Sequence, residues 1–249
     1  MATPEAGEKI IDPISQFVID RLVPIHVGGL DISFTNSALF ACIAVGLASL
    51  MFILAPRSLI PTRLQSVAES IYEFIDNMTH EVLHENARTY FPFILTLFTF
   101  ILFANVLGLI PYTFTVTSHY VVTLALALVV FIGATIIGFT RHGFRYLKLF
   151  VPSGVPVFLL PLVVVIEIVS YFIRPMSLSI RLFANMMAGH MMLKVMAGFV
   201  VMLGLAAGWL PLAAMVGLMG LELLVAALQA YVFALLTCMY LSDAMHVDH

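Results

Sequence analysis

Charged side chains are scarce in this sequence: Lys, Arg, Asp and Glu together make up 10% of its 249 residues, whereas 62% are hydrophobic. Soluble domains average about 25% charged residues, so the composition indicates an integral membrane protein. The formal net charge is only −3 and no basic cluster suggests a polyanionic partner, so we expect no binding of nucleic acid.

Other absences narrow the chemistry of the chain. Its only two cysteines, Cys42 and Cys238, both lie in apolar stretches, where they are interpreted as small buried hydrophobic residues and not as a disulfide. No G-x-x-x-x-G-K-[ST] loop is present, so we expect no nucleotide hydrolysis by the chain on its own and hence no enzyme. We also predict no cofactor and no metal site. The opening segment MATPEAGEKIIDPISQF is acidic and lacks the basic-then-apolar order of a cleavable signal.

Long apolar runs take up most of the remaining chain. A membrane-spanning helix needs about 20 mostly apolar residues. Residues 36–56 and two runs within 91–140 meet this requirement. We predict an all-α integral membrane protein with an outward segment 1–35, a first transmembrane helix 36–56, an amphipathic interfacial helix 62–86, a two-span hairpin 91–140, a basic inward loop 141–155, a long tilted helical hairpin 156–241 and an inward tail 242–249.

The basic residues outside these runs orient the chain. If the spans cross alternately, one side receives Arg57, Arg63, Arg88, Arg141, Arg145 and Lys148. By the positive-inside rule this side is cytoplasmic, or the matrix in an organelle. We therefore expect an outward N-terminus and an inward C-terminus.

Residues 62–86 differ from the other runs: apolar residues recur every three or four positions, and acidic residues lie at positions between them. The apolar set is Leu64, Val67, Ile71, Phe74, Ile75, Met78 and Val82, and the acidic residues occupy other positions. A short tether links this segment to the first span. The pattern predicts an amphipathic helix that lies on the inner membrane surface, with an ordinary amphipathic segment as the alternative.

The last two apolar segments are too long for a single upright crossing. Residues 156–207 would form a helix of ~75 Å and residues 212–241 one of ~45 Å, whereas the hydrocarbon core is ~30 Å thick. The simplest arrangement is a hairpin of two steeply tilted helices that turns at AAGWLP, residues 206–211, with Pro211 interrupting the apolar character. Such a pair offers a long lateral face to a neighbour.

A line of polar residues runs along one side of the first of these helices. At about 100° per residue its members fall within roughly 40° of one line along the helix. We call the set Glu167, Ser170, Arg174, Ser177, Arg181 and Asn185 the polar line. His190 falls on nearly the opposite side, with Lys194 one turn further on. The second helix carries Glu222 and Gln229, seven residues apart and so on one face.

Arg181 poses the sharpest question, since no acidic residue lies within thirteen positions on either side. A guanidinium stays charged at any accessible pH, and placing it at membrane depth costs at least ~2.5–3.5 kcal/mol. Either the segment lies outside the membrane or Arg181 has a partner elsewhere. Intramembrane carboxylates such as Glu167 and Glu222 face cavities, pathways or partners.

The other polar residues have simpler alternative readings. Ser170 and Ser177 can be contacts between helices, Arg174 and Lys194 can be bundle-internal or snorkelling cations, and His190 alone can be a core histidine. Taken together, the titratable groups form two sets, one on each side of Arg181. Such an arrangement is typical of two aqueous half-paths that do not meet.

Three stretches resemble a known family. SLSIRLFANMMAGH, LELLVAALQAYVFALLTCMYLSDA and, in support, FANVLGLIPYTF are similar to subunit a of the membrane sector of F-type rotary ATP synthases. The resemblance covers essentially the whole chain beyond the first thirty residues. It implies that the long hairpin curves around a rotating ring of c subunits, each bearing one essential carboxylate.

The resemblance also implies roles for individual residues. The essential arginine of the family matches Arg181, and its nearby asparagine and late glutamine match Asn185 and Gln229. His190 and Glu222 match a titratable pair of the outward half-channel. An acid of the inward half-channel matches Glu167, to which the polar line adds Ser170 and Arg174.

The His190/Glu222 pair departs from many bacterial members, which carry the acid first and the histidine second. The order here is that of mitochondrial-type members, which suggests an alphaproteobacterial or mitochondrial-like origin. The resemblance implies a proton-translocating stator subunit of a bacterial inner membrane, with the mitochondrial inner membrane as the alternative. Implied partners are the c ring, peripheral-stalk b-type subunits, the remaining synthase subunits, the bilayer and H⁺.

Two other functions remain as alternatives. A secondary transporter would use Arg174, Arg181 and Lys194 to bind an anionic substrate, but it predicts internal inverted repeats that the sequence does not show. A non-transporting scaffold explains the amphipathic helix but leaves the intramembrane charges without a use. Na⁺ can replace H⁺ in this family, although the titratable His190 favours H⁺.

Overall fold

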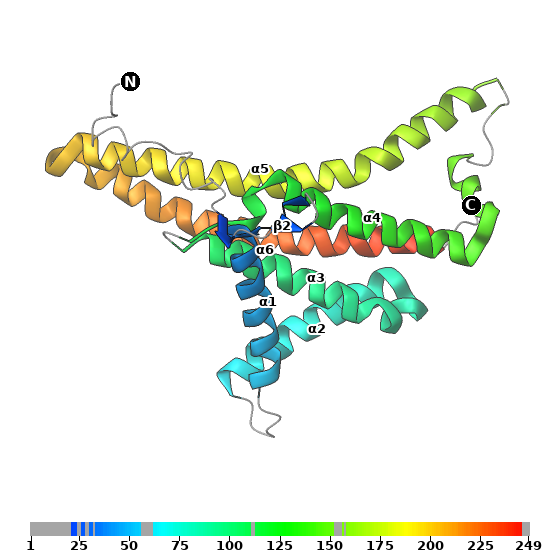
Figure 1. Cartoon of the computed structure of the whole chain (residues 1–249), viewed down its shortest axis with the longest axis horizontal. Coiled ribbons are helices and arrows are strands. Elements are labelled where there is room, and N and C mark those ends of the chain that lie inside the picture. The colour runs from blue at the N-terminus through cyan, green and yellow to red at the C-terminus, as the bar shows by residue number, and fades with distance from the viewer. Residues whose placement is uncertain are drawn as a thin grey trace. The chain divides into compact units, whose positions relative to one another are not determined.

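The computed structural model describes residues 21–23, 26–27, 30–31, 33–55, 62–110, 113–151, 156 and 158–245. Its long helices are α1 (Asn36–Leu54), α2 (Arg63–Leu83), α3 (Ala87–Gly108), α4 (Tyr120–His142), α5 (Leu160–Ala207) and α6 (Trp209–Met245) (Figure 1). Shorter 3-10 turns are η3 (His84–Asn86), η4 (Val116–Ser118) and η5 (Gly143–Phe150). Most of the predicted outward segment, the end of the predicted inward tail and Arg57 lie outside the described residues.

Five helical stretches of the described chain are long and apolar enough to cross a membrane. They are Asn36–Leu54, Arg63–Gly108, Tyr120–Leu147, Leu160–Gly204 and Trp209–Met245. The chain is therefore an all-α integral membrane protein, which confirms the predicted fold class. The depth, tilt and direction of each helix in the bilayer stay predictions.

In the described part of the chain before α1 there are four short strands, which the sequence did not predict. β1 (Arg21–Val23) pairs antiparallel with β4 (Phe34–Thr35), and β2 (His26–Val27) pairs antiparallel with β3 (Leu30–Asp31). Strands of two or three residues are too short to show an alternating pattern of polar and apolar side chains.

The turn between α5 and α6 differs from the predicted one. The helical path breaks at Gly204, whose φ of 56° lies in the left-handed region that glycine adopts without a steric penalty. The N–H of Gly208 then donates to the carbonyl of Gly204 at 2.9 Å, and α6 begins at Trp209. Pro211 does not break a helix: it is the third residue of α6, where no intrahelical N–H bond is needed.

The helices form two compact units. The first consists of residues up to Leu50, Phe100–His119 and Leu182–Ala230, and the second of Met51–Thr99, Tyr120–Arg181 and Tyr231–His249.

In the first unit, the second half of α5 and the first half of α6 run side by side (Figure 1). Ala226 and Ala230 on α6 are fully buried, and such small residues let neighbouring helices approach closely. The side chain of Asn105, at the end of α3, donates to the carbonyl of Ala226 at 3.2 Å and accepts from Thr117 at 2.8 Å. This unit therefore combines an apolar core with a buried polar network.

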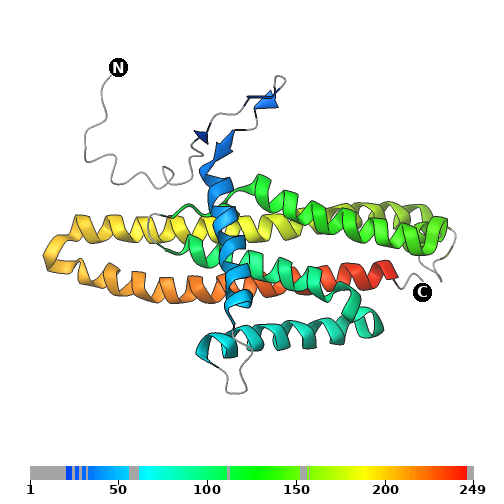
Figure 2. The same cartoon turned by 60° about the horizontal axis from the view of Figure 1, so that its bottom comes forward.

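In the second unit, α2 begins at the N-cap Thr62 and lies beside the first half of α3 (Figure 2). Tyr72 contacts Phe91, and Phe74 contacts Phe98, with ring centroids 4.7 and 6.3 Å apart. The predicted apolar face of α2 is only partly covered. Among its members, Ile75 and Met78 are buried, whereas Leu64, Val67 and Phe74 are about half exposed. This leaves an uncovered apolar strip on α2, whose interfacial position stays a prediction.

Candidate functional site

The polar line lies on the uncovered side of α5. None of its six members is buried: Ser170, Ser177 and Arg181 are exposed, and Glu167, Arg174 and Asn185 are half-buried. Adjacent apolar residues of the same helix, Leu178, Leu182 and Met186, are instead 1–3% exposed. This helix therefore keeps polar side chains on a side that the rest of the chain covers only in part, while the neighbouring apolar side chains are buried.

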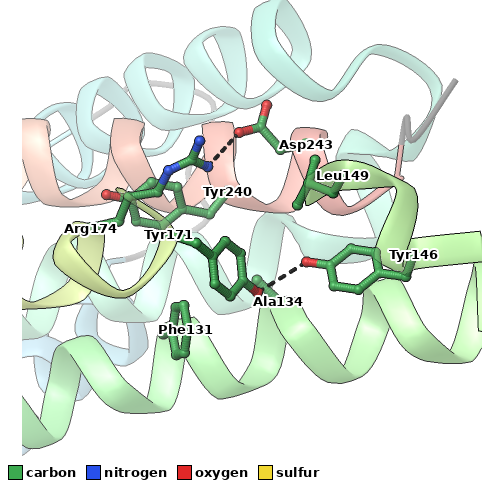
Figure 3. Close-up of a pocket in the computed structure, with 8 residues that line it drawn as sticks. All are labelled: Phe131, Ala134, Tyr146, Leu149, Tyr171, Arg174, Tyr240 and Asp243. Carbon is green, nitrogen blue, oxygen red and sulfur yellow. Dashed lines mark hydrogen bonds and ion pairs between the residues drawn. The ribbon is translucent and has the colours of Figure 1, made fainter. Parts of the chain in front are cut away.

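Arg181 has no salt bridge among the residues that the structure describes. The other arginine of the polar line, Arg174, forms one: Nη1 donates to Oδ2 of Asp243 at 2.9 Å, and the guanidinium lies 5.8 Å from the ring centroid of Tyr240 (Figure 3). The sequence leaves open whether Arg174 is bundle-internal or snorkelling. The structure gives it a carboxylate partner on α6, in the second unit.

Arg174 and Asp243 line a small cavity of about 10 Å³, which is enough for one water molecule. Figure 3 shows the hydroxyl of Tyr146 pointing at that of Tyr171, with an O···O distance of 3.1 Å. Tyr171 is also bonded to the hydroxyl of Thr135 at 2.6 Å. The second unit thus holds a small pocket lined by Arg174 of the polar line, Asp243 and three tyrosines.

The structure brings His190 and Glu222 together in the first unit. Nδ1 of His190 on α5 lies 3.6 Å from Oε1 of Glu222 on α6, and the two side chains are only 9% and 6% exposed. Nε2 of His190 lies 3.0 Å from the hydroxyl oxygen of Thr115. The imidazole therefore lies between a carboxyl group and a hydroxyl group, and a carboxyl–imidazole pair is suited to passing protons near neutral pH.

Glu222 also lines a cavity of about 200 Å³ in the first unit. Both carboxylate oxygens are buried and have no hydrogen-bond partner among the described residues. The other lining residues are Asn185, Ala188, Gly189, Met192, Leu193, Leu218, Leu221 and Val225. A cavity of this size with a buried carboxyl group and the amide of Asn185 has room and polar partners for several water molecules.

The space occupied by the Glu222 carboxyl group depends on Gly189. A Cβ atom on residue 189 would lie 2.6 Å from Oε1 and 2.9 Å from Cδ of Glu222. Atoms at such distances overlap, so only glycine lets α5 approach this side chain as closely as it does.

The remaining predicted residues are not brought into one site. Gln229 on α6 is 6% exposed but does not line the cavity beside Glu222. Glu167 is half-buried and Ser170 is exposed, and neither lines the pocket beside Arg174. Their proposed functions stay predictions.

Sequence reasoning missed three residues of these sites: Thr115, Gly189 and Asp243. Thr115 and Gly189 carry no charge, and their significance depends on a distance that no sequence pattern expresses. Asp243 follows the last apolar run, and an acidic residue at the solvated end of a helix is ordinary, so nothing in the sequence singles it out. Its spacing from Arg174 along the chain, 69 residues, gives no signal of contact.

Comparison with known proteins gives consistent matches. The family model of the ATP synthase A chain matches residues 37–242. The chain is 57% identical over 247 residues to ATP synthase subunit a of Parvibaculum lavamentivorans, covering 96% of this chain and 95% of the relative. It is 55% identical to that of Pelagibacter ubique, covering 96% and 99%, and 54% identical to that of Rhodospirillum rubrum, covering 94% and 98%.

Proposed function

The chain belongs to the family of ATP synthase subunit a, and from this premise we propose that it translocates protons in the membrane sector and couples their flow to rotation of a c ring. It is a stator subunit and the nucleotide chemistry belongs to other subunits. Two offset half-channels deliver protons to and from the ring carboxylates, and Arg181 separates them.

The exposure of Arg181 carries the proposal. An intramembrane guanidinium is costly unless it is paired, yet this one is exposed and has no salt bridge among the described residues. A partner on another subunit resolves the contradiction. A ring carboxylate that arrives from lipid is neutral, because an unpaired charge there is expensive, and it is stabilised as the anion when it faces Arg181.

Arg181 also keeps the two half-channels apart. A fixed positive charge interrupts a continuous proton wire, so protons cross only by way of the moving ring. Each proton that moves down a potential of 100 mV releases ~2.3 kcal/mol, and a short circuit at this point would dissipate that energy. We assign Asn185 and Gln229 to the same rotor-facing region from the family resemblance.

The outward half-channel is assigned to His190 and Glu222. Their burial, their separation of 3.6 Å and the cavity beside Glu222 support this assignment, because a proton relay needs titratable groups and room for water. The inward half-channel is assigned to Glu167, with Ser170 and Arg174. The polar pocket beside Arg174 supports a hydrated path on that side.

The chain is a multi-pass membrane protein whose compared relatives are bacterial, so we place it in a bacterial inner membrane. The distribution of Lys and Arg supports an outward N-terminus and an inward C-terminus. The proposed partners are the c ring and b-type peripheral-stalk subunits.

Disulfide trapping in native membranes tests the central contact. Cys42 and Cys238 are first replaced by serine, and single cysteines are placed at 174, 177, 181 and 185, each opposite a cysteine beside the ring carboxylate. We expect strong cross-links from these positions. The controls are His190→Cys, which is buried, and Ile180→Cys, which is exposed like Arg181 but lies about 100° around the helix. The absence of any cross-link from the polar line would contradict the proposal and favour a transporter.

A further inference from the structure

The two ring nitrogens of His190 face chemically different groups. Nδ1 faces the carboxyl group of Glu222 at 3.6 Å, and Nε2 lies within hydrogen-bond distance of the hydroxyl of Thr115, at 3.0 Å. A neutral imidazole carries its proton on only one of these nitrogens. The group bonded to the other nitrogen determines which one, and thereby which nitrogen can accept a further proton.

The hydroxyl of Thr115 has a single hydrogen, and a second acceptor competes for it. Thr115 Oγ1 donates to the backbone carbonyl of Gly108 at 3.4 Å. A carbonyl oxygen can only accept, whereas Nε2 can either donate or accept. Both contacts are satisfied together only when the hydroxyl donates to Gly108 and accepts from an N–H at Nε2.

We propose that Thr115 is a positioning residue, which fixes neutral His190 as the Nε2–H tautomer and leaves Nδ1 as the atom that exchanges a proton with Glu222. The transport part of this inference rests on the proposed function. The tautomer itself follows from the contacts of Thr115 alone.

The position of the Thr115 hydroxyl is well defined by its surroundings. Thr115 is 5% exposed, and its carbonyl accepts from the hydroxyl of Ser118 at 2.7 Å. On the other side, a Cβ on residue 108 would lie 2.6 Å from Cγ2 of Thr115, so Gly108 allows the close approach. The loop thus presents the hydroxyl to His190 from a backbone-anchored position.

The proton step involves two atoms only. The carboxyl proton of Glu222 moves to the lone pair on Nδ1, which leaves a carboxylate and an imidazolium, and the reverse step restores both neutral groups. The proton on Nε2 stays in place throughout. Because 3.6 Å exceeds the reach of direct transfer, the side chains must approach by roughly half an ångström or share one water from the adjoining cavity.

Two further titratable groups lie on neighbouring parts of the chain, besides Glu222, which faces His190 from α6. Lys194 follows His190 by one turn on α5. His119 belongs to the same loop as Thr115, but its ring stacks on Phe114, with centroids 4.9 Å apart.

The tautomer is measured by ¹⁵N NMR of the histidine-labelled, assembled complex in lipid, and the His190 signal is assigned by its loss in His190→Gln. We expect the Nε2–H form in the unaltered protein. Thr115→Val keeps the shape but removes the hydroxyl, so the tautomer ratio is expected to fall at least about fivefold. Thr115→Ser is expected to keep the ratio. Thr113→Val makes the same substitution in the same loop, at a hydroxyl that donates to the backbone carbonyls of Leu107 and Ile110, and serves as the control.

Passive proton conduction through the membrane sector is measured on the same samples. It is expected to fall about fivefold in Thr115→Val and to stay within about twofold in Thr115→Ser, because the proton-accepting nitrogen is misplaced only in the former. An Nδ1–H form in the unaltered protein, or an unchanged ratio in Thr115→Val, would overturn the proposal. If Thr115 controls the tautomer but His190→Gln conducts normally, the tautomer assignment stands and the proposed function of His190 fails.

Discussion

Gly189 on α5 and Glu222 on α6 approach each other so closely that a Cβ on residue 189 would lie 2.6 Å from Oε1 of the carboxyl group. This contact determines where the carboxyl group of Glu222 lies relative to Nδ1 of His190. Because every atom that this Cβ would meet belongs to the flexible side chain of Glu222, a larger residue displaces the carboxyl group.

The first prediction concerns this contact. In Gly189→Ala, Glu222 is displaced from His190, and we expect ATP-driven proton pumping in membrane vesicles to fall about tenfold, the effect of ~1.4 kcal/mol on a barrier. Gly198→Ala is the matched control, since a Cβ at that position on the same helix meets nothing within 4 Å. Equal pumping by the two variants would show that the contact with Glu222 is unimportant.

The positions of the helices were predictable from the sequence because lipid imposes a simple rule. Backbone groups in a bilayer must be satisfied within the helix, so about 20 apolar residues suffice to locate a span. The predicted runs at 36–56 and 91–140 contain α1, most of α3 and nearly all of α4. The exact turn before α6 was not predictable, because Pro211 is compatible with both a helix start and a helix end.

The candidate site was predictable only where charge marks it. Arg181, Glu222 and His190 stand out in an apolar context, and the family resemblance assigns them roles. Thr115 and Gly189 act through a hydroxyl orientation and a missing Cβ, which depend on how α5, α6 and the loop after α3 pack together. A neutral residue at such a contact is indistinguishable in sequence from one in any ordinary helix or loop.

The second prediction concerns Arg181. Arg181→Ala removes the fixed charge between the half-channels, so we expect ATP-driven pumping to be abolished while passive proton leak through the membrane sector persists. Both are measured in vesicles with fluorescent pH indicators, with and without an inhibitor of the membrane sector. Arg145→Ala, which removes an exposed charge on η5, is expected to behave as the unaltered protein. Preserved coupled pumping in Arg181→Ala would remove the basis of the proposed function.

The third prediction concerns the pairing of His190 with Glu222. Each single change, His190→Glu or Glu222→His, places two acids or two imidazoles at buried positions whose side chains now approach to 3.6 Å. Two like groups disfavour each other's charged forms, so we expect transport to slow about tenfold or more. The double exchange restores one acid and one imidazole, so it should be milder than the worse single variant. Proton pumping of all four proteins gives the coupling energy from a double-mutant cycle. A double variant no better than either single one would contradict direct coupling.

The fourth prediction concerns His119, in the loop between α3 and α4 and outside the spanning helices. Its ring stacks on Phe114 at an interplanar angle of 13°, and burial lowers the pKa of His119 below its ordinary value of 6.5. Protonation is therefore easier in the unfolded chain, which binds more protons as the pH falls. The contribution of His119 to stability is fully present above about pH 6.5 and is lost as the pH falls below it.

In His119→Phe the stacked ring is kept and the titration removed. We expect the apparent melting temperature of the assembled complex to fall less between pH 7.5 and 5.5 in this variant than in the unaltered protein. His84→Asn, which changes an exposed histidine at the end of α2, is the control and should leave the difference unchanged. If His119→Phe loses as much stability on acidification as the unaltered protein, then protonation of this residue does not oppose folding, and the acid sensitivity has another origin.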